Sequence, residues 1–293
     1  MKFEQFSHKP LEEQFNNREA IEFPGGNVEV VDIDPETKKT EIPVLVAPGW
    51  TATAEVFKNN ILTLAEAGRR TISISAPHGI ETEEIENFPE AELRKVAAVT
   101  EILEEKNIEK IDAVGHSEAG IYLTIAATLH PEKFRNIVFV DPGGMIGEDK
   151  IENLSTRFSA DTVQQIINGI KDRKLIKPMT KIFSEAGKSI SSSPLKSLRE
   201  VLAISDSQIH NLLRGLKKKG IGISIIHAVD DKAFPMDRVQ QIAKADQLDG
   251  FYSVKGTHNQ FVLKAKEYTQ LADEALTALE SKKLNKNKNL ESV

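Results

Sequence analysis

Ser117 lies at a position in the sequence where a serine could act as a nucleophile. It lies within Gly115-His116-Ser117-Glu118-Ala119-Gly120, between an apolar strand-like segment and a helix-like run. A sharp strand-to-helix turn can expose a serine hydroxyl, but its strained backbone needs small residues two positions to either side. Gly115 and Ala119 meet that need, and Gly120 permits close packing of helix on strand. An ordinary turn with small packing residues is the alternative.

A serine is a weak nucleophile at neutral pH and needs a histidine base that a carboxylate orients. Among the seven histidines, His258 follows the strand-like segment 251–254 and precedes the last helix. That position is the carboxyl edge of the sheet, where sites of open α/β sheets lie. His227 falls inside a strand pattern and is interpreted as a core histidine, while the side chain of His116 should point away from Ser117.

The acid should follow another strand between the serine and the histidine. The segment after 222–228 offers Asp231, four residues before Pro235, with Asp230 as the runner-up. Either could instead cap a helix or shape a turn. Asp141, at the end of segment 136–140, is a less favoured alternative and is expected to shape the entry to the residues that follow.

Acyl chemistry also needs hydrogen-bond donors for a developing oxyanion. The backbone N–H of Glu118, at the start of the helix, is one candidate. The second is the backbone N–H of Trp50, in the turn Pro48-Gly49-Trp50 that follows the apolar segment 41–47. An ordinary tight turn is the alternative, and the single tryptophan could also form a pocket wall.

Short β-rich segments alternate with amphipathic ones along the chain, which indicates a mostly parallel sheet with helices on both faces. Segments 28–33 and 41–48 flank residues 34–40, a pattern that predicts a hairpin or tight connection. Residues 145–221 contain no convincing strand and predict several helices, with a connector in the serine-rich part near Pro194. Such a long helical insert is typical of a functional lid.

Composition restricts the partners. The chain has 293 residues, is 40% hydrophobic and 28% charged, and carries a net charge of −6, which disfavours a nucleic-acid partner. It contains no cysteine, so disulfides and thiolate metal sites are excluded. Neither a signal peptide nor an apolar run long enough to span a membrane is present, so a cytoplasmic location is expected.

In these motifs and their order the sequence resembles the α/β-hydrolase superfamily, over residues 20–282. The matching pieces are Ala47-Pro-Gly-Trp, Gly115-His-Ser-Glu-Ala-Gly, Asp230-Asp-Lys-Ala-Phe-Pro and Gly256-Thr-His-Asn-Gln. The resemblance implies an eight-stranded-type sheet, a Ser117–His258–Asp231 triad and a helical cap after the strand ending at Asp141. Two turns depart from the family pattern: Pro48-Gly49 stands for His-Gly, and Ala76-Pro77-His78-Gly79 stands for Asp-x-Arg-Gly.

The expected domains follow from that resemblance. Residues 20–146 and 218–282 form the α/β-hydrolase core, residues 147–217 a helical cap insertion, and residues 1–19 and 283–293 terminal extensions.

The expected function is hydrolysis of a carboxylic ester of a small or acyl-chain substrate through an acyl-enzyme, with no metal or other cofactor. Hydrolysis of C–C, amide or thioester bonds and acyl transfer remain alternatives on the same residues, as does a non-catalytic ligand-binding protein on this fold. Apolar residues of the insert could build an acyl pocket or simply pack the lid. The side chains of Glu118, His78 and Arg157 could add polar contacts to a substrate, but each is expected to face solvent.

Overall fold

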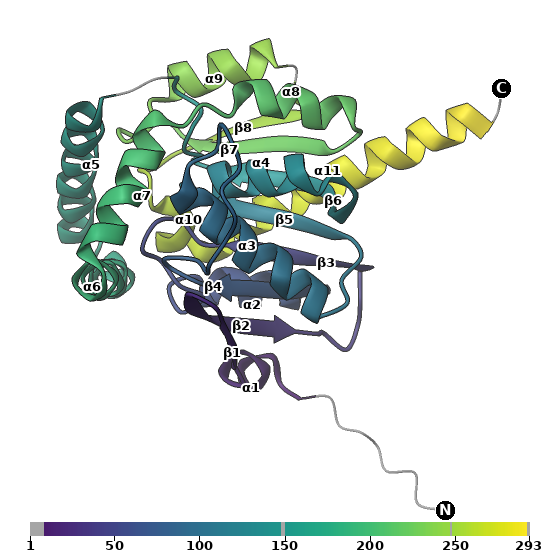
Figure 1. Ribbon diagram of the computed structural model, residues 1–293, viewed down its shortest axis with the longest axis horizontal. Helices are drawn as coiled ribbons and strands as arrows, with labels where there is room; N and C mark the ends of the chain where they lie inside the picture. Colours follow the sequence, from purple (N-terminus) through teal and green to yellow (C-terminus); the bar gives the residue numbers. More distant parts are fainter. Residues whose placement is uncertain (1–8, 148–149, 247, 292–293) are drawn as a thin grey trace, which may run out of the picture.

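One sheet of eight strands organises the computed structural model, which describes residues 9–147, 150–246 and 248–291. The strands lie in the order β1-β2-β4-β3-β5-β6-β7-β8 (Figure 1). Their bounds are β1 Glu19–Phe23, β2 Gly26–Ile33, β3 Thr40–Ala47, β4 Arg69–Ser75, β5 Ile111–His116, β6 Phe134–Val140, β7 Gly222–Ala228 and β8 Gly250–Val254. The β2 strand is antiparallel to both of its neighbours, and β3 to β8 are parallel. The predicted mostly parallel sheet is thus confirmed.

Helices cover both faces of this sheet. Their bounds are α1 Leu11–Asn16, α2 Lys58–Glu66, α3 Glu90–Glu105, α4 Ala119–Leu129, α5 Ile151–Lys171, α6 Ile176–Ser192, α7 Pro194–Asp206, α8 His210–Lys218, α9 Met236–Ala245, α10 Gln260–Leu263 and α11 Ala265–Glu291. Two short 3₁₀ turns, Pro131–Lys133 and Arg173–Leu175, complete the helical elements.

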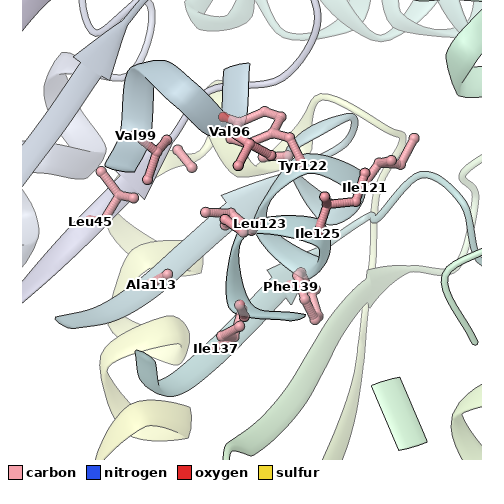
Figure 2. Packing of buried hydrophobic residues seen from close by; sticks show 14 of the residues in the cluster. Leu45, Val96, Val99, Ala113, Ile121, Tyr122, Leu123, Ile125, Ile137 and Phe139 are labelled. Atoms are coloured by element: carbon pink, nitrogen blue, oxygen red, sulfur yellow. The ribbon is translucent and has the colours of Figure 1, made fainter. Parts of the chain in front are cut away.

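Two apolar cores form because successive strand residues point to opposite faces. On one face, Leu45, Ala113 and Phe139 pack under α3 and α4, as Figure 2 shows. On the other face, Val46 and Val114 pack under α2 and α11. Because β5 and β6 are buried on both faces, their sequences are nearly continuous apolar runs.

The predicted hairpin between segments 28–33 and 41–48 is wrong. The β2 strand pairs with β4 rather than with β3, and β3 lies on the far side of β4. Residues 34–40 are therefore a crossover connection. A local sequence pattern of two strands joined by a turn does not determine whether those two strands pair with each other.

The helical insert follows β6. Helices α5 to α8 lie between β6 and β7 in the sequence, and α5, α6 and α7 gather beside one end of the sheet, at the left of Figure 1. The connector near Pro194 is short, because α6 ends at Ser192 and α7 begins at Pro194. This end of the sheet is the one where the parallel strands finish.

The N-terminal helix joins the core. Phe15 of α1, a helix in the segment that we placed outside the core domain, is fully buried in the second core with Val31 and Ile33. Across the residues searched for it, the structure contains no helix long and apolar enough to cross a membrane.

Candidate active site

Ser117 occupies a strained turn between β5 and α4. Its φ of 57° lies in the left-handed region, which non-glycine residues seldom adopt. Neighbouring backbone holds the turn: the Ser117 N–H donates to the Val140 carbonyl at 3.0 Å, and the Ser117 carbonyl accepts from the Gly143 N–H at 2.8 Å. Strain that the surroundings enforce in this way is typical of functional positions.

The small residues of the turn have specific neighbours. A Cβ built on Gly115 would lie 2.6 Å from the Leu123 side chain and 3.2 Å from Ala119 Cβ, and one built on Gly120 would lie 2.8 Å from Pro142. A larger side chain at Gly115 or Gly120 would therefore push α4 or the segment after β6 away from the sheet.

Ser117, His258 and Asp231 form a continuous hydrogen-bonded series. His258 Nε2 lies 2.8 Å from Ser117 Oγ, and His258 Nδ1 lies 2.8 Å from Asp231 Oδ2. All three side chains are buried. They follow β5, β8 and β7, so parallel strands deliver them to one edge of the sheet.

The electrostatics couple the histidine to the acid. Burial by itself would lower the pKa of His258, but the carboxylate of Asp231, with smaller contributions from Asp141 and Asp161, raises it to about 9. Burial would raise the pKa of Asp231, yet the hydrogen-bonded His258 ring holds that pKa below its ordinary value. The pair is thus arranged to stabilise an imidazolium.

The other candidate acids lie elsewhere. Asp230 is exposed, and its backbone N–H donates to Gly256. Asp141 is buried and accepts from the Ala228 N–H at 2.7 Å, with His227 Nδ1 at 3.4 Å. Burial, followed by the charge of Asp231, raises the pKa of Asp141 well above its ordinary range. Neither residue hydrogen-bonds to the His258 ring.

The two proposed oxyanion donors lie beside the serine. A Cβ on Gly49 would lie 2.9 Å from both Ser117 Cβ and the His116 carbonyl, so the turn before Trp50 touches Ser117. Within the described part of the chain, neither the Trp50 nor the Glu118 backbone N–H donates a hydrogen bond. Both remain free to bind a developing negative charge.

Three polar side chains were expected in solvent, and two of these expectations are wrong. Glu118 is buried and pairs with Lys95, and most of the His78 side chain is covered, with Nδ1 2.9 Å from Glu200 Oε1. Arg157 is partly buried, and its Nε donates to the Ala233 carbonyl at 3.0 Å.

Sequence reasoning missed supporting residues around His258. The ring of His116 lies 5.1 Å from the His258 ring, and its Nε2 donates to the His258 carbonyl at 2.9 Å. Nε2 is the donor because a carbonyl oxygen can only accept. Burial, then the charge of His258, lowers the pKa of His116 to about 3, so the ring is neutral.

Asp161 of α5 is a second missed residue. Its Oδ1 lies 3.4 Å from the backbone nitrogens of His258 and Lys232, and its Oδ2 accepts from Gln165 at 2.5 Å. An available signal was periodicity, because Asp161 and Gln165 share a helical face with Leu154 and Phe158. Polar residues on a buried face need partners.

A cavity of about 500 Å³ opens onto Ser117 and His258. No aspartate, glutamate, lysine or arginine lines it among the residues that the structure describes. Its larger lining side chains come from the core and from α5 and α6: Trp50, Phe57, Phe158, Val163, Ile182 and Phe183. The Ser117 hydroxyl therefore faces a mainly apolar space.

One group of described residues has the composition of a metal site. The ligand atoms of Asp141, His227 and Asp231 lie within 4.8 Å of one another. These side chains already contact the Ala228 N–H, the Phe234 carbonyl and His258 Nδ1. We therefore assign the group to support of the acid loop, in keeping with the prediction of His227 as a core histidine.

Comparison with known proteins agrees with this architecture. Residues 42–176 match the alpha/beta hydrolase fold family. A Mycobacterium phage D29 protein whose provisional name is non-heme haloperoxidase is 22% identical over 236 residues, which cover 76% of this chain and 83% of that protein.

Solved structures share the fold at low identity. A carboxylesterase structure from Nitrososphaera gargenis superposes with a TM-score of 0.68 and 17% identity, covering 90% of this chain and 100% of the other. A bromoperoxidase from Bacillus anthracis superposes with a TM-score of 0.64 and 17% identity, covering 86% and 96%. With its sheet order and its helical insertion, the chain has the alpha/beta hydrolase fold.

Proposed function

We propose that this protein is a serine hydrolase that cleaves uncharged carboxylic esters through an acyl-enzyme. The observation that carries the proposal is the buried Asp231–His258–Ser117 series with 2.8 Å contacts, which opens onto a cavity that no aspartate, glutamate, lysine or arginine lines among the described residues. Esterase structures among the fold's neighbours support the reaction class.

In the proposed mechanism His258 Nε2 takes the Ser117 proton as Oγ attacks the ester carbonyl carbon. The N–H groups of Trp50 and Glu118 bind the resulting oxyanion. Asp231 holds the proton of His258 Nδ1 and stabilises the imidazolium. His258 then returns the proton to the leaving alcohol as its C–O bond breaks. Water, deprotonated by His258, then attacks the acyl carbon. The C–Oγ bond breaks as His258 returns the proton to Ser117 Oγ, which releases the carboxylic acid.

The proposed cap comprises α5 to α8, within residues 147–217. Phe158 and Val163 of α5, with Ile182 and Phe183 of α6, line the cavity above the serine. These side chains favour an apolar acyl or alkyl group, since they offer no charge to pair with an ionised one. Substrates are therefore expected to be neutral on both sides of the ester.

Turnover of an ester panel tests the proposal. The purified protein is expected to hydrolyse neutral esters of short to medium acyl length, whereas Ser117→Ala and His258→Ala hydrolyse none above background. A panel with thioester, amide and C–C substrates separates the other reaction classes. Tight binding of a small apolar ligand by a folded protein that turns over none of them would support the ligand-binding alternative.

A further inference from the structure

A cluster of charged side chains is buried beneath the Trp50 turn, outside the Ser117 cavity. Glu92 and Lys95 of α3, Glu118 at the start of α4 and Glu200 of α7 are each at most 5% exposed. His78 borders them. Burying ionised groups is costly unless they are paired, so such a cluster requires an explanation beyond packing.

Glu200 joins the inserted helices to the turn. Its Oε2 accepts from the indole Nε1 of Trp50 at 3.0 Å, and its Oε1 lies 2.9 Å from His78 Nδ1 and 3.8 Å from Lys95 Nζ. Glu200 is thus the residue of α7 that binds the side chain of a proposed oxyanion donor.

The same cluster reaches the other proposed donor. Lys95 Nζ contacts Glu118 Oε2 at 2.5 Å, and the Glu118 backbone N–H follows Ser117 directly. Lys95 therefore lies between the carboxylates of Glu118 and Glu200. Both N–H groups assigned to the oxyanion belong to residues whose side chains enter this cluster.

The Trp50 turn needs external support. Gly49 has no side chain, and Thr51 adopts a φ of 60°, which an L-residue keeps only where its surroundings enforce it. The Pro48 carbonyl accepts from the Tyr122 hydroxyl at 2.7 Å, which fixes the start of the turn. At Trp50 itself, the hydrogen bond from the indole Nε1 to Glu200 fixes the side chain to a residue outside the turn.

From these contacts we infer that Glu200 is a positioning residue: through the Trp50 indole it holds the backbone N–H of Trp50 toward the oxyanion. The inference rests on the proposed serine hydrolase function and makes the seating of α7 a requirement for catalysis. The reaction is then coupled to the inserted helices by one buried carboxylate, separately from their role in lining the cavity.

The test uses the 293-residue protein and three substitutions at this bond. Trp50→Phe removes the indole N–H and keeps an aromatic ring, Glu200→Ala removes the acceptor, and Glu200→Gln restores an oxygen that can accept from Trp50. Arg199→Ala is the matched control, because Arg199 lies on the same helix with its side chain 71% exposed.

Loss of a well-placed oxyanion donor costs about 100-fold to 1,000-fold in kcat, and a displaced donor retains part of that effect. We therefore expect Trp50→Phe and Glu200→Ala to lower kcat on a short neutral ester by at least about tenfold, with KM changing less than about twofold. The rate of phosphonylation of Ser117 by a fluorophosphonate should fall by the same factor as kcat/KM. Glu200→Gln should recover most of kcat, and Trp50→Phe should add no further loss to Glu200→Ala.

Wild-type kcat in Trp50→Phe and Glu200→Ala, a change confined to KM, or losses that multiply in the double variant would overturn the inference. If Glu200→Ala does not fold, Trp50→Phe decides, since it removes one N–H. If the wild-type protein itself neither turns over esters nor labels, the proposed function fails instead, which separates the two outcomes.

Discussion

Ser117 Oγ and His258 Nε2 lie 2.8 Å apart although 141 positions separate the two residues in the sequence. The relationship follows from the sheet, because β5 and β8 run parallel and end at the same edge. Ser117 follows the first strand directly, and a short loop carries His258 from the second. The contact is therefore a property of topology as much as of the two side chains.

Asp231 and its neighbour Asp230 provide a matched pair for testing the acid. Asp231→Asn leaves the shape of the side chain but cannot stabilise the imidazolium, so kcat is expected to fall by about three to four orders of magnitude. Asp230→Asn should have wild-type kcat, because its side chain is exposed and away from His258. Steady-state kinetics on one neutral ester measures both. A larger loss of kcat in Asp230→Asn than in Asp231→Asn would make Asp230 the acid.

Gly49 is expected to be required for activity because of its contact with the nucleophile. In Gly49→Ala the new Cβ lies 2.9 Å from Ser117 Cβ and from the His116 carbonyl, so the serine or the turn must move. A displacement near 1 Å lowers kcat/KM about 100-fold, and overpacking costs about 1–3 kcal/mol in the free energy of unfolding.

Gly187→Ala is the control for that substitution. A Cβ at Gly187, in α6, meets nothing within 4 Å. Activity should be unchanged, and the free energy of unfolding should rise by about 0.5–1 kcal/mol because alanine favours the helix. Kinetics and urea denaturation of both variants give the comparison; equal activity in the two alanine variants would contradict the close approach at Gly49.

The pH dependence of kcat/KM should follow the ionisation of His258. As the proposed base, His258 must be neutral, and its pKa is raised to about 9 against the effect of burial, chiefly by Asp231. The neutral fraction therefore increases as pH rises toward about 9, and kcat/KM should increase with it. In Asp231→Asn the main raising charge is gone, so the acid limb of a much lower profile should move to lower pH. Profiles with coincident acid limbs would argue against this coupling.

The cavity should set the preference for acyl length. Ala186 of α6 lines it, so Ala186→Phe fills space that a longer acyl chain would occupy. We expect KM for longer esters to rise by about tenfold or more while kcat for acetate esters stays within about twofold. Lys188→Phe, two residues further along α6 with its side chain 71% exposed, should leave the acyl-length preference unchanged. An unaltered profile in Ala186→Phe would place the acyl chain elsewhere.

Much of this site was predictable because its residues are marked by local context. Ser117, His258 and Asp231 each follow an apolar strand-like segment. The alternation of such segments with helical ones indicates a parallel sheet, whose strands end at one shared edge. Glu118 and His78 were misassigned because their partners, Lys95 and Glu200, lie on other helices. The β2–β3 hairpin was wrong for the same reason: pairing of β2 with β4 is a long-range choice that local turn chemistry does not encode.

The most direct test of the central claim is covalent labelling of Ser117 by a fluorophosphonate, with the modified peptide identified by mass spectrometry. The account predicts stoichiometric labelling of the wild-type protein at Ser117, none in Ser117→Ala, and labelling slowed by at least about 100-fold in His258→Ala. Absence of labelling in the folded wild-type protein, or labelling that is equally fast without His258, would contradict an activated serine.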